Sequence, residues 1–210
     1  MIARDRRRLL ADQLEVARRR GMLGPGPVEA HLRHSAAMAE AIDPDFDGRF
    51  LDLGSGAGVP GLILLEVWPG APGVLLDARR RRCGFLENAL RQLDVADRAS
   101  AACGRAEDLA REERFRAGFD LVVARGFGSP AATAECGVGF LGPGGRLAVS
   151  EPPGAPSRER WPVEGLAELG LGPAELRRGT DAGIAVVEAT RPVSERWPRR
   201  SGVPGRRPLW

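Results

Sequence analysis

A glycine-rich stretch from Asp52 to Gly61, DLGSGAGVPG, constrains the fold of this chain more than any other feature. It follows an apolar run at 49–53 that is typical of a β-strand. A helix is expected to open near Pro60, because proline lacks the N–H that the first helical turn leaves unpaired. Glycines permit a sharp turn and a close approach by a ligand, and a helix N-terminus favours negative charge. The sequence therefore predicts a strand–turn–helix unit that binds a ligand.

Strand and helix patterns alternate along the rest of the chain. Further strands are predicted by apolar runs at 73–77, 99–103, 119–124, 146–150, 171–177 and 184–189. Helices are predicted at 9–20, 28–42, 80–93 and 130–140. A tight Gly-Pro-Gly-Gly turn is expected at 142–145. This alternation predicts an α/β fold in which helices cover both faces of a mostly parallel sheet, with ligands at the carboxyl ends of the strands.

The length of 210 residues suits one domain with modest appendages. We assign residues 1–45 to N-terminal helices that pack on or cap the core, 46–192 to the main domain and 193–210 to a basic C-terminal arm. The arm interleaves arginines with tryptophans, which suits phosphate pairing and base stacking on RNA. Its prolines predict an extended chain. The alternative is that the arm packs on the body of the protein through Trp197.

Basic residues are concentrated at the two ends of the chain. All 31 are arginine, and the formal net charge is +3. Residues 1–20 carry seven arginines against three acids and residues 191–210 carry six against one, so the segment between them is acidic. Such ends indicate a polyanionic partner, because phosphate neutralisation supplies most nonspecific affinity for nucleic acids. Solvated tails are the alternative interpretation.

Several protein classes are excluded by composition. Without lysine there is no Walker A motif and no Schiff-base enzyme. The only histidines are His31 and His34, so no metal site is expected. Cys83, Cys103 and Cys136 have no CxxC spacing and an odd count, which predicts buried thiols and a reducing compartment. With no apolar signal segment and no membrane-spanning run, we expect a cytoplasmic protein.

Two acidic residues favour one ligand over another for the glycine turn. The spacing Gly56-x-Gly58-x-x-Gly61 matches the dinucleotide fingerprint, which keeps a nicotinamide enzyme as an alternative. Asp52, however, suits the cationic amino-acid end of S-adenosylmethionine better than a pyrophosphate. Asp77, at the end of the next predicted strand, is placed to accept hydrogen bonds from ribose hydroxyls in either case. The pair favours S-adenosylmethionine as the cofactor.

The run LDLGSGAGVPG at 51–61 resembles the first motif of the glucose-inhibited division protein B family, small-subunit ribosomal RNA methyltransferases that modify guanine at N7. Further stretches with this resemblance lie at 75–77, 81–86, 104–107, 124–125 and 197–209. The resemblance implies a class I S-adenosylmethionine-dependent methyltransferase fold, Rossmann-like and seven-stranded, with an N-terminal helical extension. It also implies methyl transfer to N7 of a guanine in 16S rRNA, as naked RNA or within the 30S subunit, by a protein we expect to be a monomer.

The candidate site residues follow from the resemblance and from the chemistry of the turn. The resemblance places Gly54, Val59, Ala106, Glu107 and Arg125 at the donor site, and the turn and strand ends add Asp52, Ser55, Gly56, Gly58 and Asp77. The candidate RNA-binding residues are Arg81, Arg82, Arg196, Arg199, Arg200, Arg206 and Arg207. Guanine N7 has a free lone pair, so no catalytic base is needed and rate comes from proximity and orientation. Arg125 is the candidate for positioning the donor or the target base.

Glu151 departs from the pattern of the resembled family. It stands where the family carries a lysine at the end of the fifth strand, which reverses a charge on the face expected to meet RNA. Two alternatives therefore remain at this stage. One is a diverged paralogue that methylates another RNA or a small molecule, and the other is a non-catalytic RNA-binding or ribosome-assembly factor that retains the fold.

Overall fold

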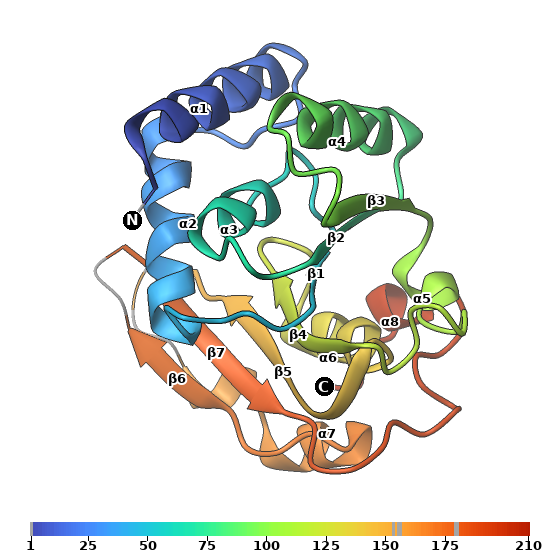
Figure 1. The fold of residues 1–210 in the computed structure, drawn as a ribbon. Helices are drawn as coiled ribbons and strands as arrows, with labels where there is room; N and C mark the ends of the chain where they lie inside the picture. The colour runs from blue at the N-terminus through green and yellow to red at the C-terminus, as the bar shows by residue number, and fades with distance from the viewer. Residues whose placement is uncertain (1, 153, 155–156, 179–180) are drawn as a thin grey trace.

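The computed structural model describes residues 2–152, 154, 157–178 and 181–210. Within these residues a seven-stranded sheet runs through the molecule in the order β3-β2-β1-β4-β5-β7-β6 (Figure 1). The strands are β1 Phe50–Leu53, β2 Gly73–Asp77, β3 Ala99–Cys103, β4 Phe119–Ala124, β5 Leu141–Ser150, β6 Glu175–Arg178 and β7 Gly183–Glu188. Pairs from β3 to β5 are parallel, whereas β7 is antiparallel to both β5 and β6. The predicted mostly parallel sheet is confirmed.

Helices cover both faces of the sheet (Figure 1). One face carries α1 Arg4–Arg19, α2 Val28–Ile42, α3 Gly61–Val67 and α4 Arg80–Gln92. The other carries α5 Ala106–Leu109, α6 Pro130–Val138, α7 Val163–Leu169 and α8 Val203–Arg206, with a 3-10 turn η1 at Arg158–Arg160. Alternate strand residues supply two separate cores, Leu75 for example facing the first and Leu76 the second. No helix in the described ranges is long and apolar enough to cross a membrane.

The N-terminal helices are part of the first core. Leu10 and Leu14 of α1 are fully buried, as is Met38 of α2. Arg6 ties α1 to the body, since its Nε donates to Glu66 Oε2 of α3 at 2.8 Å and its Nη2 donates to the carbonyl of Leu93 at 2.6 Å. These contacts fix α1 against α3 and the end of α4.

Two predictions for the second half of the chain are wrong in detail. Residues 142–145 are not a free turn but part of β5, because Gly144 and Gly145 exchange backbone hydrogen bonds with Ala189 beyond the end of β7. The strand predicted at 171–177 is shortened to β6, and Leu171 makes only an isolated bridge. Helix α7 was not predicted, since seven residues give too little helical periodicity to detect.

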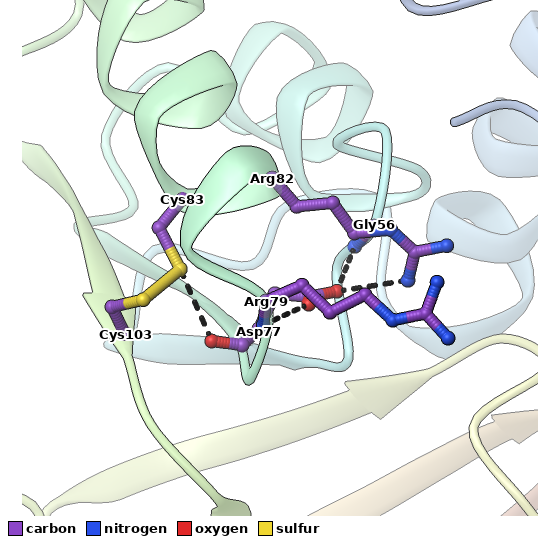
Figure 2. Close-up of a disulfide and its surroundings, with 6 residues drawn as sticks. All are labelled: Gly56, Asp77, Arg79, Arg82, Cys83 and Cys103. Atoms are coloured by element: carbon purple, nitrogen blue, oxygen red, sulfur yellow. Dashed lines mark hydrogen bonds and ion pairs between the residues drawn. A yellow bond between two sulfur atoms is a disulfide. The ribbon is translucent and has the colours of Figure 1, made fainter. Parts of the chain in front are cut away.

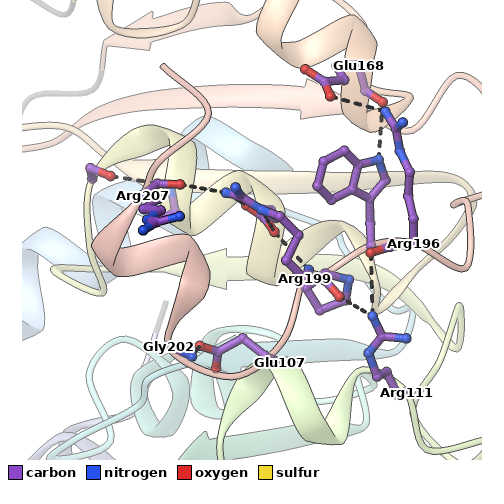
Figure 3. A network of polar contacts seen from close by, with 12 residues as sticks. Glu107, Arg111, Glu168, Arg196, Arg199, Gly202 and Arg207 are labelled. Atoms are coloured by element: carbon purple, nitrogen blue, oxygen red, sulfur yellow. Dashed lines mark hydrogen bonds and ion pairs between the residues drawn. The ribbon is translucent and has the colours of Figure 1, made fainter.

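The C-terminal residues do not form an extended arm, which corrects the prediction from the prolines. The chain instead folds back onto α6 and α7, with a cis peptide before Pro198 and a helical turn at α8. Trp197 is buried, and its Nε1 donates to the carbonyl of Glu168 at 3.3 Å. Arg199 binds the fully buried carboxylate of Glu135 through Nε at 2.8 Å and Nη2 at 2.6 Å. Figure 3 shows this network, in which a buried charge on α6 takes its partner from the end of the chain.

Replacing Arg199 with alanine should lower the free energy of unfolding by about 3 kcal/mol, because the buried Glu135 carboxylate loses its cation. Urea unfolding followed by circular dichroism measures this change. The matched control is Arg200→Ala, at the neighbouring exposed position, for which a change within about 0.5 kcal/mol is expected. Equal stabilities of the two variants would contradict the role given to Arg199.

Candidate active site

The glycine turn between β1 and α3 requires glycine at two positions for different reasons. Gly54 has a φ of +75°, and a Cβ there would lie 2.6 Å from Cδ2 of Phe127. At Gly61 a Cβ would lie 2.2 Å from Cδ2 of Leu75 and 2.6 Å from Oδ2 of Asp52. The first is a left-handed backbone under an aromatic ring, and the second is a close approach of α3 to the sheet.

Asp52 of β1 binds both ends of this turn through its carboxylate. Its Oδ2 accepts hydrogen bonds from Ser55 Oγ at 2.6 Å and from the Gly61 N–H at 2.8 Å. Its Oδ1 is buried and has no hydrogen-bond partner among the described residues. Burial raises the pKa of Asp52 to about 6, against the lowering effect of the bonds from Ser55 and Gly61. An orphaned buried carboxylate oxygen fits a cationic ligand group, such as the ammonium of S-adenosylmethionine.

Asp77 holds the turn from the neighbouring strand. Its Oδ2 accepts from the Gly56 N–H at 3.0 Å and lies 3.3 Å from Nη1 of Arg82, and its Oδ1 accepts from the Arg79 N–H at 2.9 Å (Figure 2). The carboxylate thus joins the glycine turn to the start of α4. A carboxylate offers about four acceptor positions, so Asp77 retains capacity for a ribose hydroxyl.

Two of the three cysteines contradict the prediction of buried thiols. Cys83 of α4 and Cys103 at the end of β3 form a disulfide, and Cys103 is exposed (Figure 2). In the parallel pairing of β2 with β3, Cys103 lies opposite Asp77. Helix α4 begins three residues after Asp77, so Cys83 in its first turn comes close to Cys103. Cys136 is buried as expected. Burial raises the pKa of the Cys136 thiol, with Glu107 adding to the effect, so this thiol is not a nucleophile.

Three cavities meet at the carboxyl ends of β1, β2, β4 and β5. The adenine-side cavity, of about 290 Å³, is lined by residues that include Gly54, Leu76, Ala106, Glu107, Phe127 and Gly205. The turn cavity, of about 280 Å³, is lined by residues that include His31, Gly54, Ser55, Val59, Arg82 and Arg125. The large cavity, of about 600 Å³, is lined by residues that include His34, Arg125, Phe127, Glu151, Arg160 and Arg178. Gly54, Arg125 and Phe127 each line two of the three cavities, so the cavities adjoin one another.

The adenine-side cavity has a wall that sequence reasoning missed. Glu107 is buried, and its Oε1 accepts from the Gly202 N–H at 2.8 Å (Figure 3). The same oxygen accepts from Arg105 Nη2 at 3.1 Å. Gly205 of α8 lines the same cavity. The C-terminal segment therefore forms part of the wall of this cavity, and no local pattern around Gly202 indicates this contact.

Arg125 and the two histidines form a fixed group beside Asp52. Arg125 Nη2 donates to Nδ1 of His31 at 2.9 Å, which leaves the His31 proton on Nε2. His34 donates from Nδ1 to the Asp181 carbonyl and accepts at Nε2 from Ser150 Oγ, both at 2.9 Å. Burial lowers the pKa of each histidine, and the charge of Arg125 lowers it further. Both rings are thus neutral hydrogen-bonding groups that hold α2 to the strand ends.

The predicted RNA-binding arginines fall into two sets. Arg81, Arg200, Arg206 and Arg207 are exposed and remain candidates. The other three have partners within the protein. Arg82 pairs with Asp77 and lines the turn cavity. Arg196 pairs with Glu168 at 3.2 Å and lies over the Trp197 ring, and Arg199 binds Glu135. Arg199 is therefore committed to a buried ion pair rather than to a ligand.

Glu151 does not present a bare negative charge to the large cavity. Its Oε1 accepts from Trp161 Nε1 at 3.0 Å, and its Oε2 lies 2.9 Å from Nε of Arg160. The Glu151 side chain is 1% exposed and that of Arg160 is 40% exposed. The charge reversal noted in the sequence is thus compensated by an arginine nine residues further on.

The strand order, the glycine turn and the acidic ends of β1 and β2 define a class I S-adenosylmethionine-dependent methyltransferase fold. Similar solved structures include an S-adenosylmethionine-dependent O-methyltransferase from Thermotoga maritima, with a TM-score of 0.56 and 15% identity over 87% of this chain and 73% of that chain. Another is an O-methyltransferase from neocarzinostatin biosynthesis in complex with S-adenosylmethionine, with a TM-score of 0.60 and 18% identity over 72% and 52%. At these identities the likeness shows the fold.

The family follows from closer relatives. The family model described as rRNA small subunit methyltransferase G matches residues 26–150. The ribosomal RNA small subunit methyltransferases G of Moorella thermoacetica and Streptococcus gordonii are 30% and 31% identical over 85% and 86% of this chain, and 77% and 80% of their own. The chain belongs to this family, which confirms the resemblance. It is an enzyme, and S-adenosylmethionine is its methyl donor.

Donor binding should weaken at acid pH through Asp52. The pKa of Asp52 in the folded protein, about 6, lies above its ordinary value of 3.8. Ionisation of Asp52 therefore lowers the stability of the donor-free protein as pH rises from 3.8 to 6. The ammonium group of a bound donor would offset this loss of stability. Between pH 7.5 and 5 the Kd for S-adenosylmethionine should rise about tenfold as the carboxyl protonates. Isothermal titration calorimetry measures it. Asp52→Asn should bind weakly and show a flatter profile, and a profile as steep as the wild type's would contradict this role.

Asp77→Ala should weaken donor binding by about 1–3 kcal/mol, because the Gly56 N–H loses its acceptor and a ribose partner is removed. The Kd from calorimetry at pH 7.5 gives this value directly. Asp97→Ala is the control, since Asp97 is an exposed acid at the other end of the sheet, before β3. An unchanged affinity in Asp77→Ala would remove Asp77 from the donor site.

Proposed function

We propose that this protein transfers the methyl group of S-adenosylmethionine to N7 of a guanine in 16S rRNA. The observation that carries this acceptor is the chemistry of the large cavity. Its described acidic and imidazole side chains are engaged: Glu151 by Trp161 and Arg160, and His34 by Ser150 and a backbone carbonyl. Asp181 lies 3.8 Å from Arg33. A site whose bases are occupied suits an acceptor nitrogen that needs no deprotonation, as guanine N7 does.

The donor half of the cleft offers a partner for each part of the donor. The apolar side chains of Leu76 and Ala106 and the buried Glu107 suit the adenine ring. We assign Asp77 to the ribose hydroxyls, because its carboxylate retains acceptor capacity, and the unpaired Oδ1 of Asp52 to the methionine ammonium. The glycine turn at 54–58 permits the close approach of the backbone that such a ligand needs.

Donor and acceptor would meet where the cavities join, beside Arg125. The donor supplies a methyl group on a positively charged sulfonium. In the transfer the carbon–sulfur bond breaks, its electron pair stays on sulfur, and the N7 lone pair forms the new bond. Arg125 is held by His31, and Phe127 lies over Gly54, so these two side chains line the junction. The contribution of these residues is position and orientation.

The basic ends of the chain are proposed to bind the RNA around the target. Exposed arginines of the C-terminal segment, Arg200, Arg206 and Arg207, lie on the segment that lines the adenine-side cavity through Gly205. We treat residues 1–45 and 193–210 as additions to a methyltransferase domain at 46–192. The 30S subunit is the proposed partner, and a cytoplasmic monomer is the proposed form.

Incubation with labelled S-adenosylmethionine and 16S rRNA, naked or in unmodified 30S subunits, should give 7-methylguanosine at one site, detected by nucleoside mass spectrometry. A transcript made with 7-deazaguanosine, which has a C–H in place of N7, is the matched control and should accept no label. Labelled product from the control transcript would contradict N7 as the acceptor. The absence of any product, from protein shown to bind the donor, would contradict rRNA as the substrate.

A further inference from the structure

Arg160 lines the large cavity and is paired with a buried carboxylate. Its guanidinium meets the buried Glu151 carboxylate through Nε at 2.9 Å. Its backbone carbonyl accepts a hydrogen bond from Nε1 of Trp210 at 3.1 Å. Trp161, the next residue, is buried and donates to the same Glu151. Oε2 of Glu151 has no hydrogen-bond partner among the described residues, so Arg160 and Glu151 form a close ion pair without an aligned hydrogen bond, and 40% of the Arg160 side chain remains exposed.

The orientation of this contact leaves part of the guanidinium for a second partner. The guanidinium is planar and carries five N–H groups in a rigid fork. The carboxylate contact is recorded at Nε and the side chain is partly exposed, so we take the Nη1–Nη2 end as the part that a planar, bidentate acceptor such as a phosphate would meet. Glu151 cannot turn to another partner at low cost, because its side chain is 1% exposed and is also bound by Trp161.

The direction in which charge moves decides between a base and a phosphate as this partner. Methylation at N7 makes the guanine ring positively charged. A cation bonded to the base would oppose that change, whereas a cation bonded to a phosphodiester is neutralised by it. Arg125 and Arg178 line the same cavity, so an uncompensated base would face three guanidinium groups. Phosphate is the partner that is compatible with transfer.

We propose that Arg160 binds an RNA phosphodiester next to the target guanine, and that Glu151 is the positioning residue that holds Arg160 there. This inference rests on the proposed function and specifies how its acceptor is held. It also gives the reversed charge at position 151 a role: the carboxylate does not contact RNA but orients the cation that does.

The first test compares two arginines of the same turn. Arg160→Gln should raise the KM for rRNA about tenfold, lower kcat less than threefold and leave the Kd for S-adenosylmethionine unchanged. The salt dependence of RNA binding should fall by about one phosphate contact. Arg158→Gln, an exposed position in η1 that does not line the large cavity, should leave all four quantities near wild type. Equal effects in both variants would reduce Arg160 to a general surface charge and overturn the proposal.

The second test separates positioning from structural support by reversing the ion pair. Glu151→Arg combined with Arg160→Glu restores opposite charges, so the melting temperature should recover relative to Glu151→Arg alone. The cation would then be buried, and the KM for rRNA should stay at least as high as in Arg160→Gln. Recovery of both the melting temperature and KM would show that the pair is only structural. If the double variant does not fold, Glu151→Gln, which keeps the shape and the acceptor for Trp161, should raise KM about threefold with kcat retained, and an unchanged KM would contradict positioning.

The outcomes distinguish this inference from the proposed function. If wild-type protein forms no 7-methylguanosine in 16S rRNA, the proposed function fails. If wild-type protein forms it but Arg160→Gln matches wild type in KM and in salt dependence, the proposed function stands and the role of Arg160 is wrong.

Discussion

Two carboxylates at the ends of adjacent parallel strands hold the glycine turn, and the rest of the site depends on them. Asp52 at the end of β1 fixes the start of α3, and Asp77 at the end of β2 fixes the turn itself and the start of α4. Because β1 and β2 are parallel neighbours, both acids come from the same edge of the sheet. The burial of Asp52 has a cost: it raises the pKa of this carboxyl to about 6, and the nearby charge of Asp77 adds a smaller effect. A cationic ligand group relieves that cost, so the turn favours a donor that carries one.

The C-terminal segment joins the donor side to the surface proposed for RNA. Glu107 lines the adenine-side cavity and accepts a hydrogen bond from the N–H of Gly202. In the same segment, Arg199 pairs with the buried Glu135 of α6. The exposed arginines beyond, Arg206 and Arg207, are carried by the same helical turn or directly follow it. A segment that looks like a solvated tail by composition is therefore part of the wall of the site. RNA bound by these arginines would rest on the same structural unit as the donor.

Local sequence patterns predicted many of the helices and strands of this protein, but not the contacts between residues far apart in the sequence. The helix at 28–42 and the strand at 73–77 match the structure, because each is set by its own periodicity and its own breakers. Asp52 and Asp77 were placed correctly at strand ends for the same reason. The disulfide of Cys83 with Cys103 was missed, since it depends on the register of two strands. Packing of the C-terminal segment through Trp197 was only the alternative to an extended arm, and the structure confirms it; its partners on α6 and α7, Glu135 and Glu168, are far away in the sequence.

Charge movement across the cleft gives a physical reason for an acceptor embedded in RNA. In the proposed transfer one positive charge would move from the donor, beside Asp52 and Asp77, into the large cavity, where Arg160 and Arg178 lie. In the protein alone that movement runs from a negative region into a positive one, which is unfavourable in a partly buried cleft. Phosphodiesters bound at the guanidinium groups reverse the sign of the second region. The polymer backbone thus supplies part of the electrostatics of transfer, which a free base lacks, and this selects for a guanine presented within an RNA chain.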